Sequence, residues 1–301
     1  MGVQIKATRV FIAYRLTRPH TLTGAVQPVL IGSALAWQQD RHRFAAFLAM
    51  MIASLLIQIA TNLFNEVYDV RNGVDTTESR GASGAVAQGE IAGQRVLAAG
   101  LGCLLAAVPL GVYLSVCGGW WIAAVGLLSM AVGYLYTGGP YPLAYRPFGE
   151  LLSGLFMGPV IVVLAYAAQT GAFSWRALAV SIPIGLLLAV VVFSNNIRDM
   201  EQDRRGGRTT LPLLLGRRRS AWLMNFLVAA AYLWSVGLVG WHLVPPWTLL
   251  ALLSVPVAVR TIHPFFHAAC LQADDEAMRR STALHACFGL LYFCGLCVGG
   301  E

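Results

Sequence analysis

Charged residues are scarce in this sequence: Asp, Glu, Lys and Arg together make up 12% of the 301 residues, whereas 57% are hydrophobic. Soluble globular domains contain about 25% charged residues, so the composition excludes an ordinary soluble domain. Acidic residues are scarcer than basic ones, because the chain has 14 acidic and 21 basic residues and therefore a formal net charge of +7. We therefore expect a polytopic membrane protein. The positive charge suits anionic lipid and an anionic substrate, and it needs no nucleic acid to explain it.

Two further absences narrow the class of protein. Residues 1–18 carry four basic residues and no continuous apolar core, so we expect no cleavable signal peptide there. We expect them to lie at the membrane interface instead. The six cysteines do not form a disulfide framework. Cys294 and Cys297 make a C-x-x-C pattern, but it lies within an apolar run, where packing is a simpler interpretation than redox or metal chemistry.

Long apolar runs are abundant, and most have about the 17–25 residues that a membrane-spanning helix needs. We count nine, near 21–37, 44–64, 96–116, 120–136, 148–168, 176–196, 220–240, 247–263 and 281–299. The pattern predicts an all-α fold, with residues 1–301 forming a single transmembrane domain of nine helices.

Basic residues fix the expected orientation. With nine spans and a cytosolic N-terminus, all of the 21 basic residues lie on the cytosolic side except Arg41, Arg43 and Arg176. We therefore expect a multi-pass protein of the cell (cytoplasmic) membrane. Residues 76–94 and 137–147 become cytosolic loops. The first is rich in glycine and is interpreted as a mobile cover over a polar site, with a disordered connector as the alternative.

Polar residues gather in two stretches, each at the end of an expected helix. Asp199 and Asp203 stand four residues apart, and Asn62, Asn65 and Asp69 follow i, i+3, i+7 spacing, so each set shares one helix face. Carboxylates at such a short separation repel each other unless a cation binds them. We predict that the two stretches face each other and hold Mg²⁺ ions that bind a diphosphate.

The chemistry follows from the position of these acids. Acidic residues cost about 2.5–3.5 kcal/mol each near the centre of a membrane helix, so they are functional candidates by default. Mg²⁺ and arginine stabilise the charge that develops on a departing diphosphate. An enzyme acting on a lipid diphosphate is therefore favoured over a transporter, whose site usually lies near the membrane midplane, and over a lipid-binding scaffold.

The arginine at position 18 and the tyrosines of one loop each allow two interpretations. Arg18 either anchors a helix at the interface or contacts diphosphate. The tyrosines near 134–145 either belong to an aromatic belt or bind an aromatic co-substrate and shield a cation. His285 is interpreted as a hydrogen-bonded packing residue in an apolar helix.

Several motifs resemble the UbiA superfamily of intramembrane aromatic prenyltransferases, and the resemblance covers essentially the whole chain. Three of them are similar to motifs of the branch that prenylates 1,4-dihydroxy-2-naphthoate. They are Asn62-x-x-Asn65-Glu66-x-x-Asp69 with Gly73-x-Asp75, the run from Asn195 to Leu211, and Tyr136-Thr137-Gly138-Gly139-Pro140. Two positions depart from the pattern. Glu66 stands where Asp is usual, and Arg208 stands where Lys is common.

The resemblance implies a bundle of nine transmembrane helices and Mg²⁺-dependent ionisation of a polyprenyl diphosphate. The aromatic acceptor is 1,4-dihydroxy-2-naphthoate, with 4-hydroxybenzoate or homogentisate as alternatives, and the prenyl tail runs toward membrane lipid. The resemblance assigns metal binding to Asn65, Asp69, Asp75, Asp199 and Asp203. It makes Arg18, Arg71, Arg146, Arg198 and Arg208 candidates for the diphosphate, with Asn62, Asn195 and Asn196 orienting the acids or contacting phosphate. Tyr136, Tyr141 and Tyr145 line the cation or the acceptor, and Glu66 and Glu150 are candidate proton acceptors.

Overall fold

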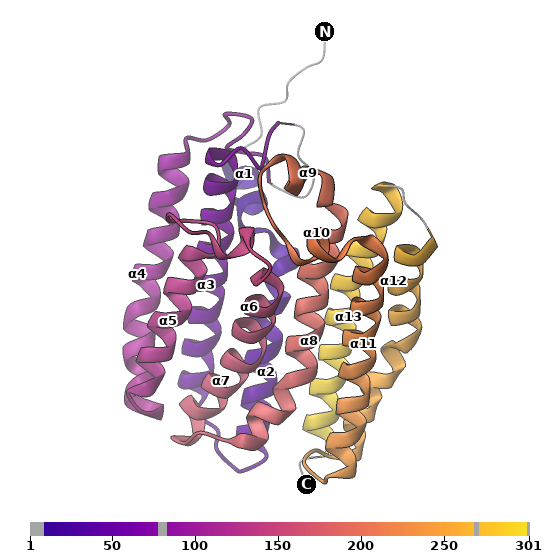
Figure 1. Ribbon diagram of the computed structural model, residues 1–301. Helices are drawn as coiled ribbons and strands as arrows, with labels where there is room; N and C mark the ends of the chain where they lie inside the picture. Colours follow the sequence, from indigo (N-terminus) through magenta and orange to yellow (C-terminus); the bar gives the residue numbers. More distant parts are fainter. Residues whose placement is uncertain (1–8, 78–82, 268–270, 300–301) are drawn as a thin grey trace.

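The computed structural model describes residues 9–77, 83–267 and 271–299, without the side chains of 264–267 and 271–273. Within these ranges the chain is helical, with no strand. Long helices run side by side as a bundle, and short helices and loops gather at one of its ends (Figure 1). The all-α class is therefore confirmed. The elements are α1 (Arg9–Thr17), η1 (Pro19–Thr21), α2 (Thr23–Trp37), α3 (Phe44–Arg71), α4 (Gly93–Gly118), α5 (Trp121–Leu135), η2 (Leu143–Tyr145), α6 (Gly149–Leu155), η3 (Phe156–Val160), α7 (Ile161–Thr170), α8 (Trp175–Arg198), α9 (Met200–Arg205), α10 (Leu211–Leu215), α11 (Arg217–Gly240), η4 (Pro246–Ser254), α12 (Val255–His267) and α13 (Leu271–Val298).

In the described part of the chain, seven helical segments are long and apolar enough to cross a membrane. They are Phe44–Arg71, Gly93–Gly118, Gly149–Thr170, Trp175–Arg198, Arg217–Gly240, Pro246–His263 and Asp274–Val298. The helix Trp121–Leu135 is apolar but shorter, and α2 has 15 residues. A polytopic membrane fold is therefore confirmed, and the count of nine spans stays a prediction.

The core of the bundle lies where α2, α7, α8, α11 and α13 meet. Ile31, Ile184, Met224 and Leu284 are fully buried in one cluster there. This packing fixes α8, which carries the second polar stretch, against α13 on one side and α2 on another.

A short π turn, η3, interrupts the span Gly149–Thr170. Pro159 lies in this turn and has no backbone N–H to donate, which disrupts the regular α-helical ladder. Gly158 packs so closely on α8 that a Cβ atom there would overlap the Cα of Gly185. The small residues bring the backbones of η3 and α8 together, as is common in membrane bundles.

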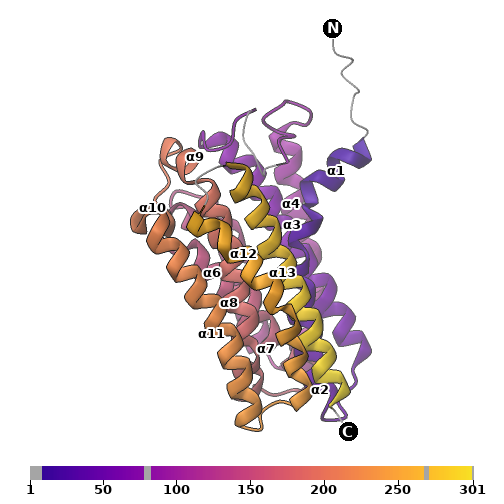
Figure 2. The ribbon, with the colours of Figure 1, turned by 90° about the vertical axis from the view of Figure 1, so that its right-hand side faces the viewer.

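Both polar stretches end at the same end of the bundle. The C-terminal end of α3 lies there beside α1 and α9, and the C-terminal end of α13 lies at the opposite end (Figures 1 and 2). Residues 10–15 of the predicted interfacial segment belong to helix α1 and are exposed or half-buried, and residues 1–8 lie outside the described chain. The five described cysteines, Cys294 and Cys297 among them, are free thiols.

Candidate active site

A cavity of about 580 Å³ opens at the polar end of the bundle. Its polar part is lined by residues from both stretches and by Arg18. The predicted site residues that line it are Arg18, Asn62, Asn65, Asp69, Asp75, Tyr136, Asn195, Asn196, Arg198, Asp199, Asp203 and Arg208. The remaining wall is largely apolar and comes mainly from α3, α4, α5, η3 and α8.

The first stretch brings two carboxylates together through a turn. Helix α3 ends at Arg71, and Gly73 adopts φ +73°, in the left-handed region that glycine tolerates best. The chain then folds back, so that the amides of Val74 and Asp75 donate to the Asp69 carbonyl at 2.8 and 3.0 Å. Asp75 therefore reaches the same cavity as Asp69 despite the six-residue gap. Gln202 Nε2 donates to Asp75 Oδ1 at 3.0 Å.

Arg208 joins the two stretches directly. Its Nη2 donates to Asp69 Oδ1 at 2.6 Å, and its Nη1 donates to Asp203 Oδ1 at 3.2 Å. The guanidinium also lies over the ring of Tyr145, 4.5 Å from the ring centre. The Tyr145 hydroxyl donates to the same Asp69 oxygen at 2.9 Å. Carboxylates that are far apart in the sequence thus share one arginine.

A second arginine pairs with the remaining acid of the α8 end. Arg198 donates from Nε and Nη2 to the two oxygens of Asp199, at 2.7 and 2.6 Å. Its Nε also lies 3.7 Å from Asp275 Oδ1 on α13. Arg198 is 9% exposed, so its charge is held in the wall of the cavity rather than in bulk solvent.

Two acids of the site are poised for an additional cation. Burial, followed by the nearby Asp69 carboxylate, raises the pKa of Asp75 to about 6. Burial raises the pKa of Asp203 to about 6 as well, with Asp199 acting in the same direction and Arg208 opposing it. Among the described residues, Asp203 Oδ2 and Asn195 Oδ1 are buried without a hydrogen-bond partner. A bound cation would satisfy these oxygens and relieve the cost of burying the charge.

The donor set fits Mg²⁺ in kind. Its oxygens come from carboxylates and carboxamides, which are hard ligands. Within residues 9–77, 83–267 and 271–299, no three His, Cys, Asp or Glu side chains gather closely enough to hold a metal ion. Mg²⁺ commonly takes one or two carboxylates and completes its shell with waters and substrate phosphate oxygens. The residues therefore fit a metal that binds together with a phosphate-bearing substrate.

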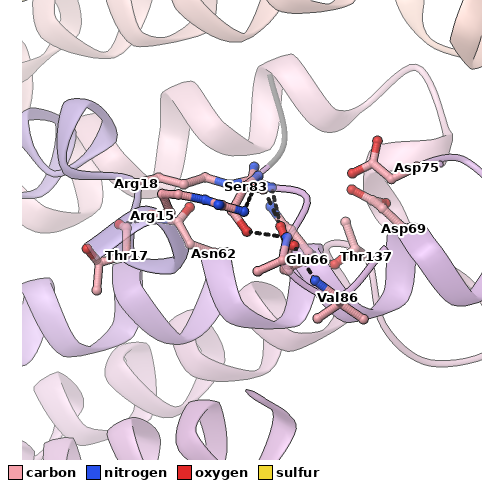
Figure 3. Close-up of polar contacts among 12 residues, drawn as sticks. Arg15, Thr17, Arg18, Asn62, Glu66, Asp69, Asp75, Ser83, Val86 and Thr137 are labelled. Carbon is pink, nitrogen blue, oxygen red and sulfur yellow. Dashed lines mark hydrogen bonds and ion pairs between the residues drawn. The ribbon is translucent and has the colours of Figure 1, made fainter. Parts of the chain in front are cut away.

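Glu66 holds the loop after α3 instead of facing the cavity. Its carboxylate accepts from the amides of Ser83 and Val86, both at 3.2 Å, and lies 3.5 Å from Arg18 Nη2. Arg15 adds a bond to the Ser83 carbonyl at 2.6 Å. Figure 3 shows these contacts beside Asp69 and Asp75. The predicted loop 76–94 is thus fastened to α3 at its described residues, while 78–82 lie outside the description.

The asparagines of the site are oriented by neighbours. Asn62 Nδ2 donates to the Thr17 carbonyl and the Thr21 hydroxyl, both at 2.9 Å. Asn65 Oδ1 accepts from Thr137 at 2.7 Å. Asn196 Nδ2 donates to the buried Glu150 at 2.8 Å. Glu150 itself is not part of the cavity lining.

Three predicted residues lie away from the cavity. Arg71 is exposed and lies over the ring of Tyr68, and Arg146 is exposed and lies 4.3 Å from the ring centre of Tyr141. Tyr141 is 57% exposed. Neither these three nor Glu66 is among the lining residues, so the structure does not bring them to the acids.

Sequence reasoning gave no site role to several lining residues: His20, Thr21, Thr137, Gln202 and His285. Thr137 and Gln202 lie within the polar motifs, and that location is the sequence signal that could have identified them as site residues. Arg18 was predicted, but its unusual backbone was not: it adopts φ +47°, and its Nε is buried without a described partner. Such strain in a non-glycine residue is typical of functional sites.

The model of the UbiA prenyltransferase family matches residues 25–288. The chain therefore belongs to the UbiA prenyltransferase family, and it is an enzyme of the prenyltransferase class.

Curated relatives narrow the comparison. The chain is 42% identical over 287 residues to the 1,4-dihydroxy-2-naphthoate octaprenyltransferase of Bacillus subtilis, covering 95% of this chain and 92% of the relative. It is 33% identical to the enzyme of the same name in Mycobacterium tuberculosis, covering 82% and 83%.

Solved structures agree on the fold. A UbiA homolog from Aeropyrum pernix superimposes with a TM-score of 0.67 at 19% identity, covering 91% of this chain and 96% of that one. A UbiA homolog from Archaeoglobus fulgidus, bound to DMAPP and Mg²⁺, gives a TM-score of 0.61 at 15% identity, covering 94% and 99%.

Proposed function

We propose that the protein transfers a polyprenyl group from a polyprenyl diphosphate to 1,4-dihydroxy-2-naphthoate. Diphosphate and CO₂ are released, and the direct product is demethylmenaquinol, the two-electron-reduced form of demethylmenaquinone. This reaction is a step of menaquinone biosynthesis. The observation that carries the proposal is the convergence of Asp69, Asp75, Asp199 and Asp203, with Arg198 and Arg208, at one end of a cavity whose wall is otherwise largely apolar. The names of the two bacterial relatives support the choice of acceptor.

The residues of the chain divide the work. Arg18, Arg198 and Arg208 bind the diphosphate, and the four aspartates and Asn65 would hold Mg²⁺. When bound, Mg²⁺ supplies the positive charge that stabilises the departing diphosphate. Tyr136 lines the cavity near the acids, where its ring can shield the allylic carbon. The apolar wall binds the prenyl tail and keeps water from the reacting carbon. Water there would hydrolyse the prenyl diphosphate before transfer.

The first prediction concerns Asp69→Asn and Asp199→Asn. Each change removes a charge from the metal and diphosphate site, so we expect transfer to fall by at least about a hundredfold. Transfer is measured with purified protein, 1,4-dihydroxy-2-naphthoate, geranylgeranyl diphosphate and Mg²⁺. EDTA is expected to stop the wild-type reaction, and added Mg²⁺ to restore it.

Glu201→Gln is the matched control. Glu201 lies in α9 between Asp199 and Asp203, but its carboxylate pairs with Arg204 and Arg205 at 3.1 and 3.0 Å and its side chain is 62% exposed. Turnover of this variant should stay within about twofold of wild type, because exposed ion pairs contribute little. Unchanged turnover in Asp69→Asn or Asp199→Asn, or transfer in EDTA, contradicts the assignment of the metal site.

A further inference from the structure

The wall of the cavity formed by α13 includes two polar side chains that the diphosphate does not explain. Away from the acids, α4 and α5 contribute mostly apolar side chains, such as Val108, Ile122 and Leu127. Helix α13 instead contributes Met278, Thr282 and His285. Their spacing of four and three residues places them on one helix face. One side of the cavity therefore suits a prenyl tail, and the side formed by α13 suits a ligand with its own hydrogen-bonding groups.

His285 is a buried polar residue of this wall whose ring nitrogen has no partner among the described residues. It is 1% exposed, lines the cavity, and its Nε2 has no hydrogen-bond partner in the described part of the protein. Buried polar atoms nearly always have a partner, because an unmet one costs the full penalty of removing it from water. An imidazole nitrogen either donates or accepts a hydrogen bond, so it suits a hydroxyl group.

Neighbouring contacts hold this part of α13 in place. Gln27 on α2 donates from Nε2 to the carbonyl of Ala286, the residue after His285, at 2.7 Å. Gly289, one turn further along, packs so closely on Gln27 that a side chain there would collide with it. The imidazole is therefore presented to the cavity by a fixed backbone, as a binding residue requires.

The position of His285 along α13 indicates which part of a bound ligand it would contact. Asp275, which lies 3.7 Å from Arg198, marks the polar end of α13. Ten residues of helix separate it from His285, which is about 15 Å along the axis. Side chains on a helix tilt toward its N-terminus, here the polar end, so the imidazole is expected on the polar side of its own Cα atom. The space between them suits an aromatic ring, whereas the diphosphate is retained by the arginines at the polar end and a prenyl tail has no polar group to offer.

We infer that His285 Nε2 hydrogen-bonds a ring hydroxyl of the aromatic acceptor, and that the acceptor ring lies against the α13 wall. This inference rests on the proposed function. It identifies α13 as the acceptor side of the cavity, and α4 with α5 as the prenyl side.

The test uses His285→Leu, which removes the hydrogen bond and keeps an apolar side chain. We expect the KM for 1,4-dihydroxy-2-naphthoate to rise about tenfold or more, because a lone hydroxyl would then face hydrocarbon. The KM for geranylgeranyl diphosphate should stay within about twofold, which also reports an intact fold. His285→Gln keeps a polar group at this position and should recover most of the acceptor affinity.

A second ligand separates hydrogen bonding from shape. 2-Naphthoate has the ring and the carboxylate but lacks both hydroxyls, so its inhibition constant should be the same for wild type and His285→Leu. Tyr292→Phe is the control on the same helix: its hydroxyl donates to the Val180 carbonyl at 3.3 Å, it is fully buried, and it does not line the cavity. We expect this variant to leave both substrate constants unchanged.

The outcomes are distinct. Equal weakening of 2-naphthoate and the dihydroxy acceptor in His285→Leu, or an unchanged acceptor KM, overturns the inference while leaving the proposed function intact. Wild-type protein that prenylates no naphthoate overturns the proposed function, and the inference with it.

Discussion

At the scale of single residues, two carboxylates near the end of α3 have different partners and different roles. Asp69 and Glu66 lie three residues apart on the same helix. Asp69 contacts Arg208 in the cavity wall, whereas the carboxylate of Glu66 reaches the amides of Ser83 and Val86. Glu66 therefore supports the site by holding a loop beside it, and none of these contacts gives it the position of a proton acceptor.

Replacing Glu66 tests this supporting role. Glu66→Ala leaves two partly buried amides without their acceptor, so we expect the loop to open more readily, by about 1–3 kcal/mol in the opening free energy. Hydrogen–deuterium exchange measures this opening. The amides of the segment 83–92 should exchange faster than in the wild type, whereas those of α8 should exchange at the wild-type rate. Glu90→Gln is the control, since it removes only the partly exposed pair with Arg15 at 3.1 Å. Unaltered exchange in Glu66→Ala would show that the loop is held by other contacts.

Helical periodicity predicted that Asp199 and Asp203 share one face and that Asn62, Asn65 and Asp69 share another. The convergence of the two sets on one cavity was predicted from chemistry, because carboxylates at such short separations need a bound cation. Periodicity did not predict the partners of Arg71 and Arg146, which lie over tyrosine rings outside the cavity. Their side chains are long enough to turn either way, and only packing decides. His285 was recognised in the sequence, but its lack of a partner depends on the arrangement of α2, α8 and α13 and is not visible in the chain.

At the scale of elements, the contact of η3 with α8 sets the position of the second polar stretch. The sequence predicted one regular span near 148–168, and the π turn at Pro159 interrupts it. The close approach of Gly158 to Gly185 requires two glycines from separate spans to meet. No local pattern encodes that meeting.

Gly158→Ala tests the packing of this contact. The added methyl group overlaps backbone that cannot rotate away, so we expect destabilisation of about 1–3 kcal/mol. Thermal unfolding in detergent, followed by circular dichroism, should show a lower midpoint. Gly102→Ala on α4 is the control, because no described atom lies within 4 Å of the place that its new methyl group would take. An equal midpoint for both variants would show that η3 and α8 adjust at no cost.

At the scale of the whole molecule, the acids and most arginines lie at one end of the bundle, and the opposite end has few charges. The sequence predicted this asymmetry well, because basic residues sort by side and helices alternate in direction. It predicted the lateral arrangement of the helices poorly, since apolar faces carry little information about which neighbour they meet. The side of the membrane that the polar end faces stays a prediction from charge alone.

Labelling from one side tests this orientation. In a chain whose six cysteines are replaced, a single cysteine is placed at the exposed Glu201, near the cavity, or at the exposed Ala172, in the loop at the other end. A membrane-impermeant maleimide added to intact cells should label Ala172→Cys, and Glu201→Cys only after the cells are opened. The reverse pattern would place the site on the outer face.

The pairing of Arg208 with both Asp69 and Asp203 has a consequence for how the enzyme meets its substrates. One guanidinium ties the first half of the chain to the second, so the distance between the two acid-bearing helix ends is a property of the protein alone. Substrates then enter a frame that is already built, and little affinity is lost to assembling it. Gln202 adds a second link through Asp75, so the enzyme is preorganised before either substrate arrives.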